Sequence, residues 1–204
     1  MARSRYFTTA IGFIAFALSA TQVFAQGDSQ VQQGLNISPV ELNTQGLNVS
    51  LVGLGSYIIN GPAGCTGCHT NGARFLPGGN PFLGQTQLDN TTNFLGGGRV
   101  FMFNSNPAGT PAILVPIIAR NLTPDKNGKP AGLTLEEFMF TIRTGTDLKL
   151  PAAPPAPWPT PNLLQIMPWY EFRNLTDHDL RGLYEYLRAI PCVEGGPGVP
   201  ANRC

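Results

Sequence analysis

The segment Cys65–His69, which reads Cys-Thr-Gly-Cys-His, holds the residues of this chain best suited to chemistry. Two thiols three positions apart can add to the two vinyl groups of a haem, and a histidine directly after the second thiol can bind the iron. The two residues between the thiols are small, which suits a turn pressed against a flat macrocycle. The chain has only two histidines, so the five-residue pattern is specific. We therefore predict one covalent haem c attached at Cys65 and Cys68, with His69 as the proximal iron ligand.

Three other interpretations of this segment stay open. A thioredoxin-like redox cysteine pair needs a preceding strand in a βαβ setting, whereas the residues before Cys65 have a helical pattern. A zinc site needs a fourth ligand, and neither Cys192 nor His178 has the spacing of one. The third alternative is a chance occurrence without function.

A second axial ligand would separate electron transfer from chemistry at an open iron. Four methionines are present: Met1 falls in a predicted signal peptide, Met102 reads as a core or hairpin residue, and Met139 as a packing residue on a helix. Met167 is better placed, because it lies in a loop before the last predicted helix. The proline after it stiffens that loop, and Trp169 offers a large wall for a haem pocket.

The predicted site needs further partners. The His69 imidazole should donate its other ring nitrogen to a carbonyl, and Pro77 is our candidate acceptor. Candidates for contact with the haem propionates, with simple packing as the alternative, are Trp169, Tyr170, Arg120 and Arg173. His178 lies between two aspartates in the first turn of an exposed helix, so we expect it to be solvated.

Apolar spacing, capping residues and stop signals predict three helices that position these residues. They run from Asn48 or Ser50 to Gly61, from Thr134 to Gly145 and from Thr176 to Pro191. Between the first two, Val100–Phe103 and Ile113–Ile118 read as short extended pieces. Six prolines between Pro151 and Pro161 predict a stiff, extended path. We expect an all-α fold, with a few helices around one haem and long Gly/Pro-rich loops.

Length and composition indicate one domain of ordinary size. The chain has 204 residues, 42% of them hydrophobic, with 24 glycines and 19 prolines. Residues 1–25 read as a signal peptide, with an uncleaved membrane anchor as the alternative. Cleavage would leave 11 basic and 12 acidic side chains, which gives no basic stripe for nucleic acid. We expect residues 26–46 to be a flexible leader, 47–191 the domain and 192–204 a C-terminal tail.

Two further cysteines lie near the C-terminus. Export places the chain in an oxidising compartment, where spare thiols tend to pair. Cys192 and Cys204 would then close a short loop worth about 2–3 kcal/mol. Two free thiols are the alternative.

These motifs together resemble class I cytochromes c. The resemblance rests on Cys65–His69, on Met-Pro-Trp at Met167–Trp169, on Leu175–Asp177 and on a last helix ending Tyr-Leu-Arg at Tyr186–Arg188. The runs Leu95–Arg99 and Ala119–Asp125 resemble the cytochrome c subunits and domains of bacterial membrane dehydrogenases. The resemblance covers residues 47–191 and implies the cytochrome c fold, with His69 and Met167 as axial ligands. It also implies that the first and last helices cross, with Gly55 against Leu183, Tyr184 and Leu187.

The leading hypothesis is single-electron transfer in the periplasm, as a carrier or as the relay subunit of a dehydrogenase, and not an enzyme by itself. Its partners would be redox proteins, donor and acceptor unknown, with association with a membrane-bound dehydrogenase or oxidase as one setting. A haem enzyme such as a peroxidase, with a labile sixth ligand, is the alternative. A purely scaffolding subunit is the third hypothesis.

Overall fold

The computed structural model describes residues 29–104, 114–149, 162–195 and 203–204. The predicted signal peptide and the proline-rich segment 151–161 therefore lie outside the described residues. None of the helices in the described ranges is long and apolar enough to cross a membrane.

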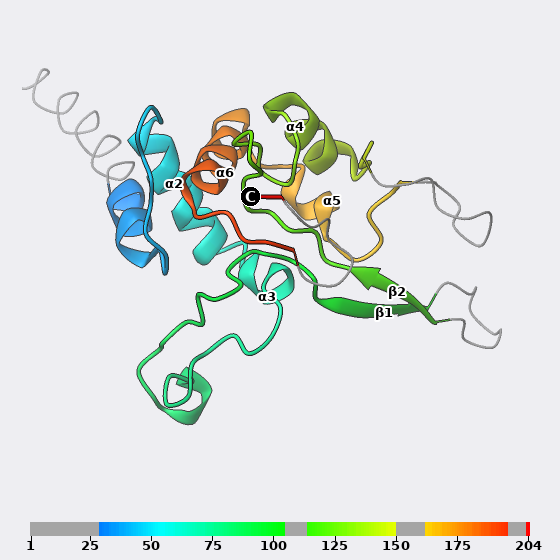
Figure 1. Ribbon diagram of the computed structural model, residues 1–204. Helices are drawn as coiled ribbons and strands as arrows, with labels where there is room; N and C mark the ends of the chain where they lie inside the picture. Colours follow the sequence, from blue (N-terminus) through cyan, green and yellow to red (C-terminus); the bar gives the residue numbers. More distant parts are fainter. Residues whose placement is uncertain (1–28, 105–113, 150–161, 196–202) are drawn as a thin grey trace, which may run out of the picture.

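Two helices that are far apart in the sequence cross at the centre of the fold (Figure 1). Helix α2 (Val49–Asn60) begins at Asn48, whose side chain accepts a hydrogen bond from the Leu51 amide. Helix α6 (Asp177–Ala189) begins with a capping box between Thr176 and Asp179. Both helices start and end within a residue or two of the predicted positions, because capping side chains satisfy backbone donors locally.

The crossing is a contact of backbone against backbone. A Cβ atom on Gly55 would lie 1.9 Å from the Gly182 carbonyl oxygen and 2.8 Å from the Tyr186 Cβ. The predicted crossing is therefore confirmed, but Gly55 faces Gly182 and Tyr186 rather than Leu183, Tyr184 and Leu187. Those three side chains are buried within the same hydrophobic core instead.

Part of the segment predicted to be a flexible leader has regular secondary structure in the described residues. Residues 29–37 form a helix that precedes α2 (Figure 1). The buried Ser56 hydroxyl on α2 donates a 2.6 Å hydrogen bond to the Gly34 carbonyl, and Ser38 lies 3.2 Å from the Tyr186 hydroxyl. Further along, the Asn43 amide donates to the Ala189 carbonyl. The Gln- and Asn-rich composition suggested disorder, but small residues let this segment pack closely on α2.

A third helix packs beside the crossing. Helix α4 (Leu135–Thr144) carries the predicted capping box, with Thr134 and Glu137 bonding reciprocally, and ends at Gly145. The Phe138 ring lies 5.6 Å from the Tyr184 ring on α6. The shorter elements are α3 (Thr66–His69), η1 (Pro81–Leu83) and α5 (Trp169–Phe172).

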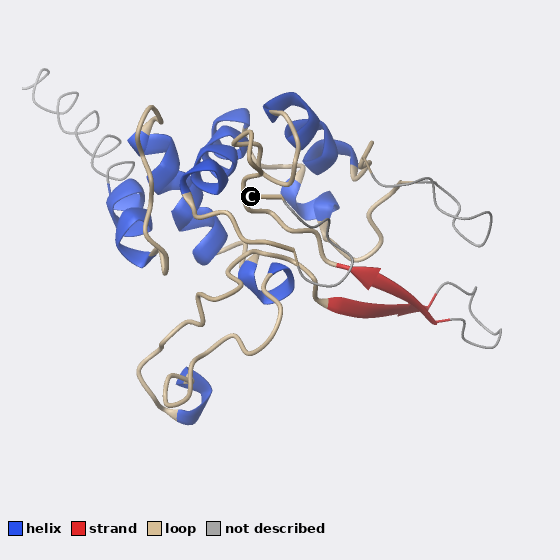
Figure 2. Ribbon diagram, in the orientation of Figure 1, coloured by secondary structure: helices blue, strands red, loops and turns tan. Residues whose placement is uncertain are grey.

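The expectation of an all-α fold is wrong, because the described residues also contain a sheet (Figure 2). Strands β1 (Val100–Asn104) and β2 (Leu114–Ile118) pair antiparallel, with Val100 opposite Ile118 and Asn104 opposite Leu114. The fold is therefore mixed α and β. Aromatic and β-branched residues favour this pairing. The sequence predicts that both runs are extended, but only the tertiary structure shows that they pair with each other.

A disulfide joins Cys192 to Cys204, which confirms the pairing considered from the sequence. The segment after α6 lies against the middle of the chain. The Val193 amide donates to the Thr123 hydroxyl, and the Asn121 side chain donates to the Val193 carbonyl at 2.8 Å. The tail is therefore part of the fold around residues 121–123.

Candidate functional site

The residues of the predicted haem motif share one helical turn. Helix α3 (Thr66–His69) follows α2 after a tight turn, and the His69 amide donates to the Cys65 carbonyl at 2.9 Å. Cys65 is half-buried and packs against the hydrophobic core, whereas Cys68 is exposed. Both thiols are free, so both can bond to one ligand at this turn.

The His69 ring is fixed by a carbonyl from a distant segment. Its Nδ1 lies 2.7 Å from the Arg120 carbonyl oxygen. A carbonyl only accepts, so Nδ1 carries the hydrogen and the lone pair of Nε2 is left for a metal ion. Burial lowers the pKa of His69, which favours the neutral imidazole that a metal requires, although the hydrogen bond to Arg120 opposes this shift.

The predicted acceptor, Pro77, is wrong. Residues 71–92 form a loop that extends away from the helices (Figure 1) and pairs with itself, with the Leu76 amide donating to the Leu88 carbonyl. Pro77 is exposed in this loop. The chain returns to His69 only later, which the spacing alone did not reveal.

Two segments later in the chain form backbone hydrogen bonds with each other and with the motif. The Gly97 amide donates to the His69 carbonyl at 2.7 Å, and Leu122 donates its amide to the Leu95 carbonyl at 2.9 Å. Leu95 and Gly97 lie on one of these segments, and Arg120 and Leu122 lie on the other. The two segments are therefore bonded to each other, and each is bonded to His69.

Arg99 is a contact that the sequence analysis missed. Its guanidinium donates a 2.6 Å hydrogen bond to the Gly67 carbonyl inside the motif and lies 5.7 Å from the centre of the Phe101 ring. Arg99 directly follows the triple-glycine run, and this position of a basic residue was the only feature of the sequence that could have indicated the contact.

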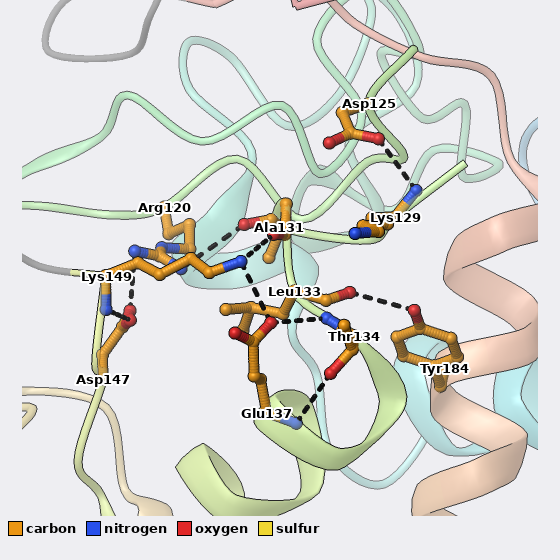
Figure 3. Close-up of polar contacts among 11 residues, drawn as sticks. Arg120, Asp125, Lys129, Ala131, Leu133, Thr134, Glu137, Asp147, Lys149 and Tyr184 are labelled. Carbon is orange, nitrogen blue, oxygen red and sulfur yellow. Dashed lines mark hydrogen bonds and ion pairs between the residues drawn. The ribbon is translucent and has the colours of Figure 1, made fainter. Parts of the chain in front are cut away.

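The Arg120 guanidinium, a candidate for contact with a haem propionate, makes an ion pair within the protein. It pairs with the Asp147 carboxylate at 2.7 Å, beside the Ala131 carbonyl (Figure 3). Asp147 is 2% exposed, so this is a buried carboxylate. Sequence reasoning missed Asp147, because an acid two positions after a helix-ending glycine carries no signal of burial.

Arg173, another propionate candidate, serves the fold through its backbone. Its carbonyl accepts from Arg143 on α4, which also donates to the Leu175 carbonyl and pairs with Asp177 at 2.7 Å. Arg143 therefore clamps the turn between α5 and α6. His178 is exposed in the first turn of α6, as predicted.

Met167 lies in the segment that leads into α5. It is partly buried and packs against the same hydrophobic core as Cys65. Met139 also packs against that core from α4, as predicted, whereas Met102 on β1 is 57% exposed. Of the described methionines, Met167 alone combines a loop position with partial burial.

Trp169 lies flat against the end of α4. A Cβ atom on Gly145 would stand 2.3 Å from the Trp169 Cε2, and Gly145 has a φ of +71°. Glycine is therefore required there twice, for its backbone conformation and for the indole. The indole also makes an edge contact with the Tyr170 ring, with centroids 6.2 Å apart.

Cys65 differs from the reactive thiol of a redox cysteine pair. Burial raises the pKa of Cys65 to about 12, whereas catalytic redox thiols have a lowered pKa. The preceding element is helix α2, not a strand. Within the described ranges, no three His, Cys, Asp or Glu side chains gather so that they could hold a metal ion.

An apolar hollow lies beside the motif. It has a volume of about 260 Å³ and is lined by residues of α2, the turn before Cys65, and the α5–α6 segment, among them Leu54, Ile58, Ala63, Phe172 and Leu175. The hollow is also lined by Gln30 and Asp179, and Cys65, Cys68, His69 and Met167 are not among its lining residues. The two free thiols on one turn and the imidazole with Nε2 available fit a haem.

Comparison of the chain with known protein families and with curated proteins finds no match. The candidate function therefore rests on the residues and geometry of this chain.

Proposed function

We propose that this protein transfers single electrons through one covalently attached haem c. The observation that carries the proposal is the turn Cys65–His69, in which both thiols are free and the His69 Nδ1–H is already engaged by the Arg120 carbonyl. When bound, haem supplies a one-electron ferric/ferrous couple.

Cys65 and Cys68 hold the group covalently. Each thiol adds across one vinyl double bond: a carbon–sulfur bond forms, and the thiol hydrogen passes to the neighbouring vinyl carbon. The addition is redox-neutral, so it needs no oxidant. Half-buried Cys65 and exposed Cys68 lie on the same turn, which matches two attachment points on one edge of a macrocycle.

His69 and Met167 are the proposed axial ligands. A neutral thioether favours the ferrous state and so raises the reduction potential. If the hollow lined by Leu54, Ile58 and Phe172 held part of the haem, its apolar side chains would further disfavour the extra charge of the ferric state. If His69 and Met167 both bound the iron, small molecules would find no open site, and a carrier would be favoured over a peroxidase.

The setting follows from the same proposal. Covalent attachment of haem takes place outside the cytoplasm, and the signal-like residues 1–25 agree with a periplasmic location. The electron donor and acceptor would be redox proteins, with a membrane-bound dehydrogenase or oxidase among the candidate assemblies. The resemblance to class I cytochromes c, which spans residues 47–191, supports this assignment.

The first test is covalent attachment. The exported chain, matured in a host that attaches haem c, should keep its haem in the polypeptide fraction after acid–acetone extraction. The Cys65→Ala, Cys68→Ala double variant should release all of it. A wild-type protein that is colourless, or whose pigment is extracted, would contradict the proposal.

The second test concerns the sixth ligand. Met167→Ala should abolish the ferric methionine-to-iron charge-transfer band, while the matched variant Met139→Ala keeps it. A high-spin ferric spectrum with rapid peroxide turnover in the wild type would favour the peroxidase alternative.

A further inference from the structure

One buried ion pair lies between the segment that orients His69 and the turn that contacts the Met167 segment. The Arg120 guanidinium meets the Asp147 carboxylate at 2.7 Å, with the carboxylate side chain 3% exposed and the arginine side chain 26% exposed (Figure 3). The other carboxylate oxygen of Asp147 accepts from the Lys149 amide at 2.9 Å. Both carboxylate oxygens are therefore engaged, and the side chain is held in one orientation.

The Arg120 end of this pair reaches the histidine side of the site. The carbonyl of the same residue accepts the His69 Nδ1–H at 2.7 Å. The neighbouring backbone is locked as well, because the Gly98 amide donates to the Ala119 carbonyl and the Ala119 amide to the Arg99 carbonyl, both at 2.8 Å. The position of Arg120 therefore sets where the imidazole of His69 stands.

The Asp147 end reaches the methionine side. The Asp147 amide donates to the Asn162 carbonyl at 2.9 Å, and the Leu164 amide donates to the Gly145 carbonyl at 2.8 Å. These bonds flank a short antiparallel bridge between Thr146 and Leu163. The segment that is pinned in this way ends three residues before Met167.

A second pin acts on the same segment from beyond Met167. The Trp169 indole lies on Gly145, two residues before Asp147. Met167 is thus bracketed between two contacts that both end on the 145–147 turn. The ion pair between Asp147 and Arg120 holds the 145–147 turn in place relative to Arg120. It therefore also holds the Met167 segment in place relative to His69.

We propose that Arg120 and Asp147 are positioning residues, which hold the Met167 segment in register with His69 so that the thioether stays on the iron. This inference rests on the proposed function. Neither side chain needs to touch the haem: the pair acts through the Arg120 carbonyl on one side and the 145–147 turn on the other.

The test uses the full-length, haem-loaded protein and the double variant Arg120→Met, Asp147→Asn. Removing both charges leaves no buried charge without a partner, so the variant can fold. The side-chain amide oxygen that Asp147→Asn introduces can still accept from the Lys149 amide, and residue 120 keeps its backbone carbonyl for His69. Lys149→Met is the matched control, because it removes a nearby cation whose side chain pairs instead with Glu137 at 3.0 Å.

Three readouts are taken: the ferric methionine charge-transfer band, the midpoint potential, and the apparent Kd for added imidazole. In the double variant we expect a weakened band, a lowered potential and an apparent Kd for imidazole at least about tenfold smaller, since a competing ligand binds in proportion to the fraction with Met167 detached. Arg120→Lys, which keeps a cation for Asp147, should recover most of the affinity difference.

Unchanged values of all three readouts in the double variant, relative to Lys149→Met, would overturn the inference while leaving the proposed function intact. Equal changes in both variants would also overturn it, because the Arg120–Asp147 pair would then have no effect of its own. A wild-type protein without covalent haem, or without a Met167-dependent band, would overturn the proposed function itself and this inference with it.

Discussion

The α2–α6 crossing and the β1–β2 hairpin are both built from apolar residues, yet only one of them is a core. Val52, Leu180 and Leu187 at the crossing are at most 1% exposed, whereas Val100 and Met102 on the hairpin are 52% and 57% exposed. Similar residue types therefore end in opposite environments. The difference lies in the partner surface: each helix of the crossing meets another apolar face, while one face of the hairpin meets none among the described residues.

The comparison also separates the stability of the molecule from the chemistry of its site. The crossing supplies the burial that stabilises the fold, at about 25 cal/mol per Å² of apolar surface removed from water. The loops that return to His69 supply orientation through single hydrogen bonds. The effects of substitutions in the two regions should therefore differ, both in their size and in the property that they change.

The largest effect is expected where the two helix backbones touch. Gly55→Leu would force a side chain into the Gly182 carbonyl, 1.9 Å from the new Cβ, and a backbone group cannot rotate away. We expect a loss of about 3 kcal/mol or more in the free energy of unfolding, although leucine favours a helix over glycine by about 1 kcal/mol. Urea unfolding of the purified protein measures this.

The matched control for that substitution lies on the same helix. Val49 is 46% exposed at the start of α2, so Val49→Leu should change stability by less than about 0.5 kcal/mol. If Gly55→Leu were as stable as this control, the helices would not cross at Gly55.

The next largest effect concerns the C-terminal disulfide, which fastens the tail beside residues 121–123. Replacing Cys192 and Cys204 together by serine should cost about 2–3 kcal/mol, mainly because the unfolded chain regains the freedom of the short closed loop. Thermal unfolding with and without a thiol reductant measures this, since thioether bonds resist reduction. The reduced wild type should match the double variant; a variant as stable as the oxidised wild type would refute the prediction.

A smaller, pH-dependent effect is expected at the start of α4. The hydrogen bond from the Thr134 amide, followed by the contact with Lys149, lowers the pKa of Glu137 below 4.5. A lowered folded-state pKa adds stability above the unfolded value, and this stability is lost as the pH falls through the folded value. Glu137→Gln should therefore be less stable near neutral pH and lose less stability on acidification.

Urea unfolding at about pH 7 and about pH 3 tests this sign. The gap between wild type and Glu137→Gln should narrow at the lower pH. Glu185→Gln, which breaks the Glu185–Arg188 pair on α6, serves as a comparison. A gap that widens on acidification would show that the Glu137 carboxylate does not act in this way.

The smallest effect is expected on the hairpin. Met102→Thr together with Leu114→Thr replaces two exposed apolar side chains, 57% and 56% exposed, by a residue that also favours strands. The free energy of unfolding should change by less than about 0.5 kcal/mol. A loss above about 1.5 kcal/mol would mean that these two side chains stabilise the fold, contrary to their exposure.

Much of the fold was predictable where the cause is local. Side chains that satisfy backbone donors within four residues explain the three main helices, the capping box at Thr134 and the helix cap at Thr176, and these predictions are confirmed. The partnership of Cys192 with Cys204 is also confirmed. The all-α expectation failed because two runs recognised as extended found each other across residues 105–113, and a sequence pattern does not state pairing.

The residues of the candidate site could be predicted from the sequence, but their contacts could not. The five-residue motif identified Cys65, Cys68 and His69 from their spacing, but Arg120 rather than Pro77 accepts from His69. The ion pair between Arg120 and Asp147 was not predicted either. Both contacts join residues that are far apart in the sequence, where loop paths rather than spacing decide which groups meet.

What the sequence determined by itself is chemistry that fits within a few residues: two thiols and an imidazole on one turn, and helices that begin and end at their own caps. What only the tertiary structure decided is which backbone carbonyl orients the imidazole, and which buried carboxylate ties that carbonyl to the methionine segment. The physical reason is range. Hydrogen bonds within a turn are fixed by local geometry, whereas the bonds from His69 to Arg120 and from Arg120 to Asp147 join residues far apart in the sequence and depend on the tertiary structure.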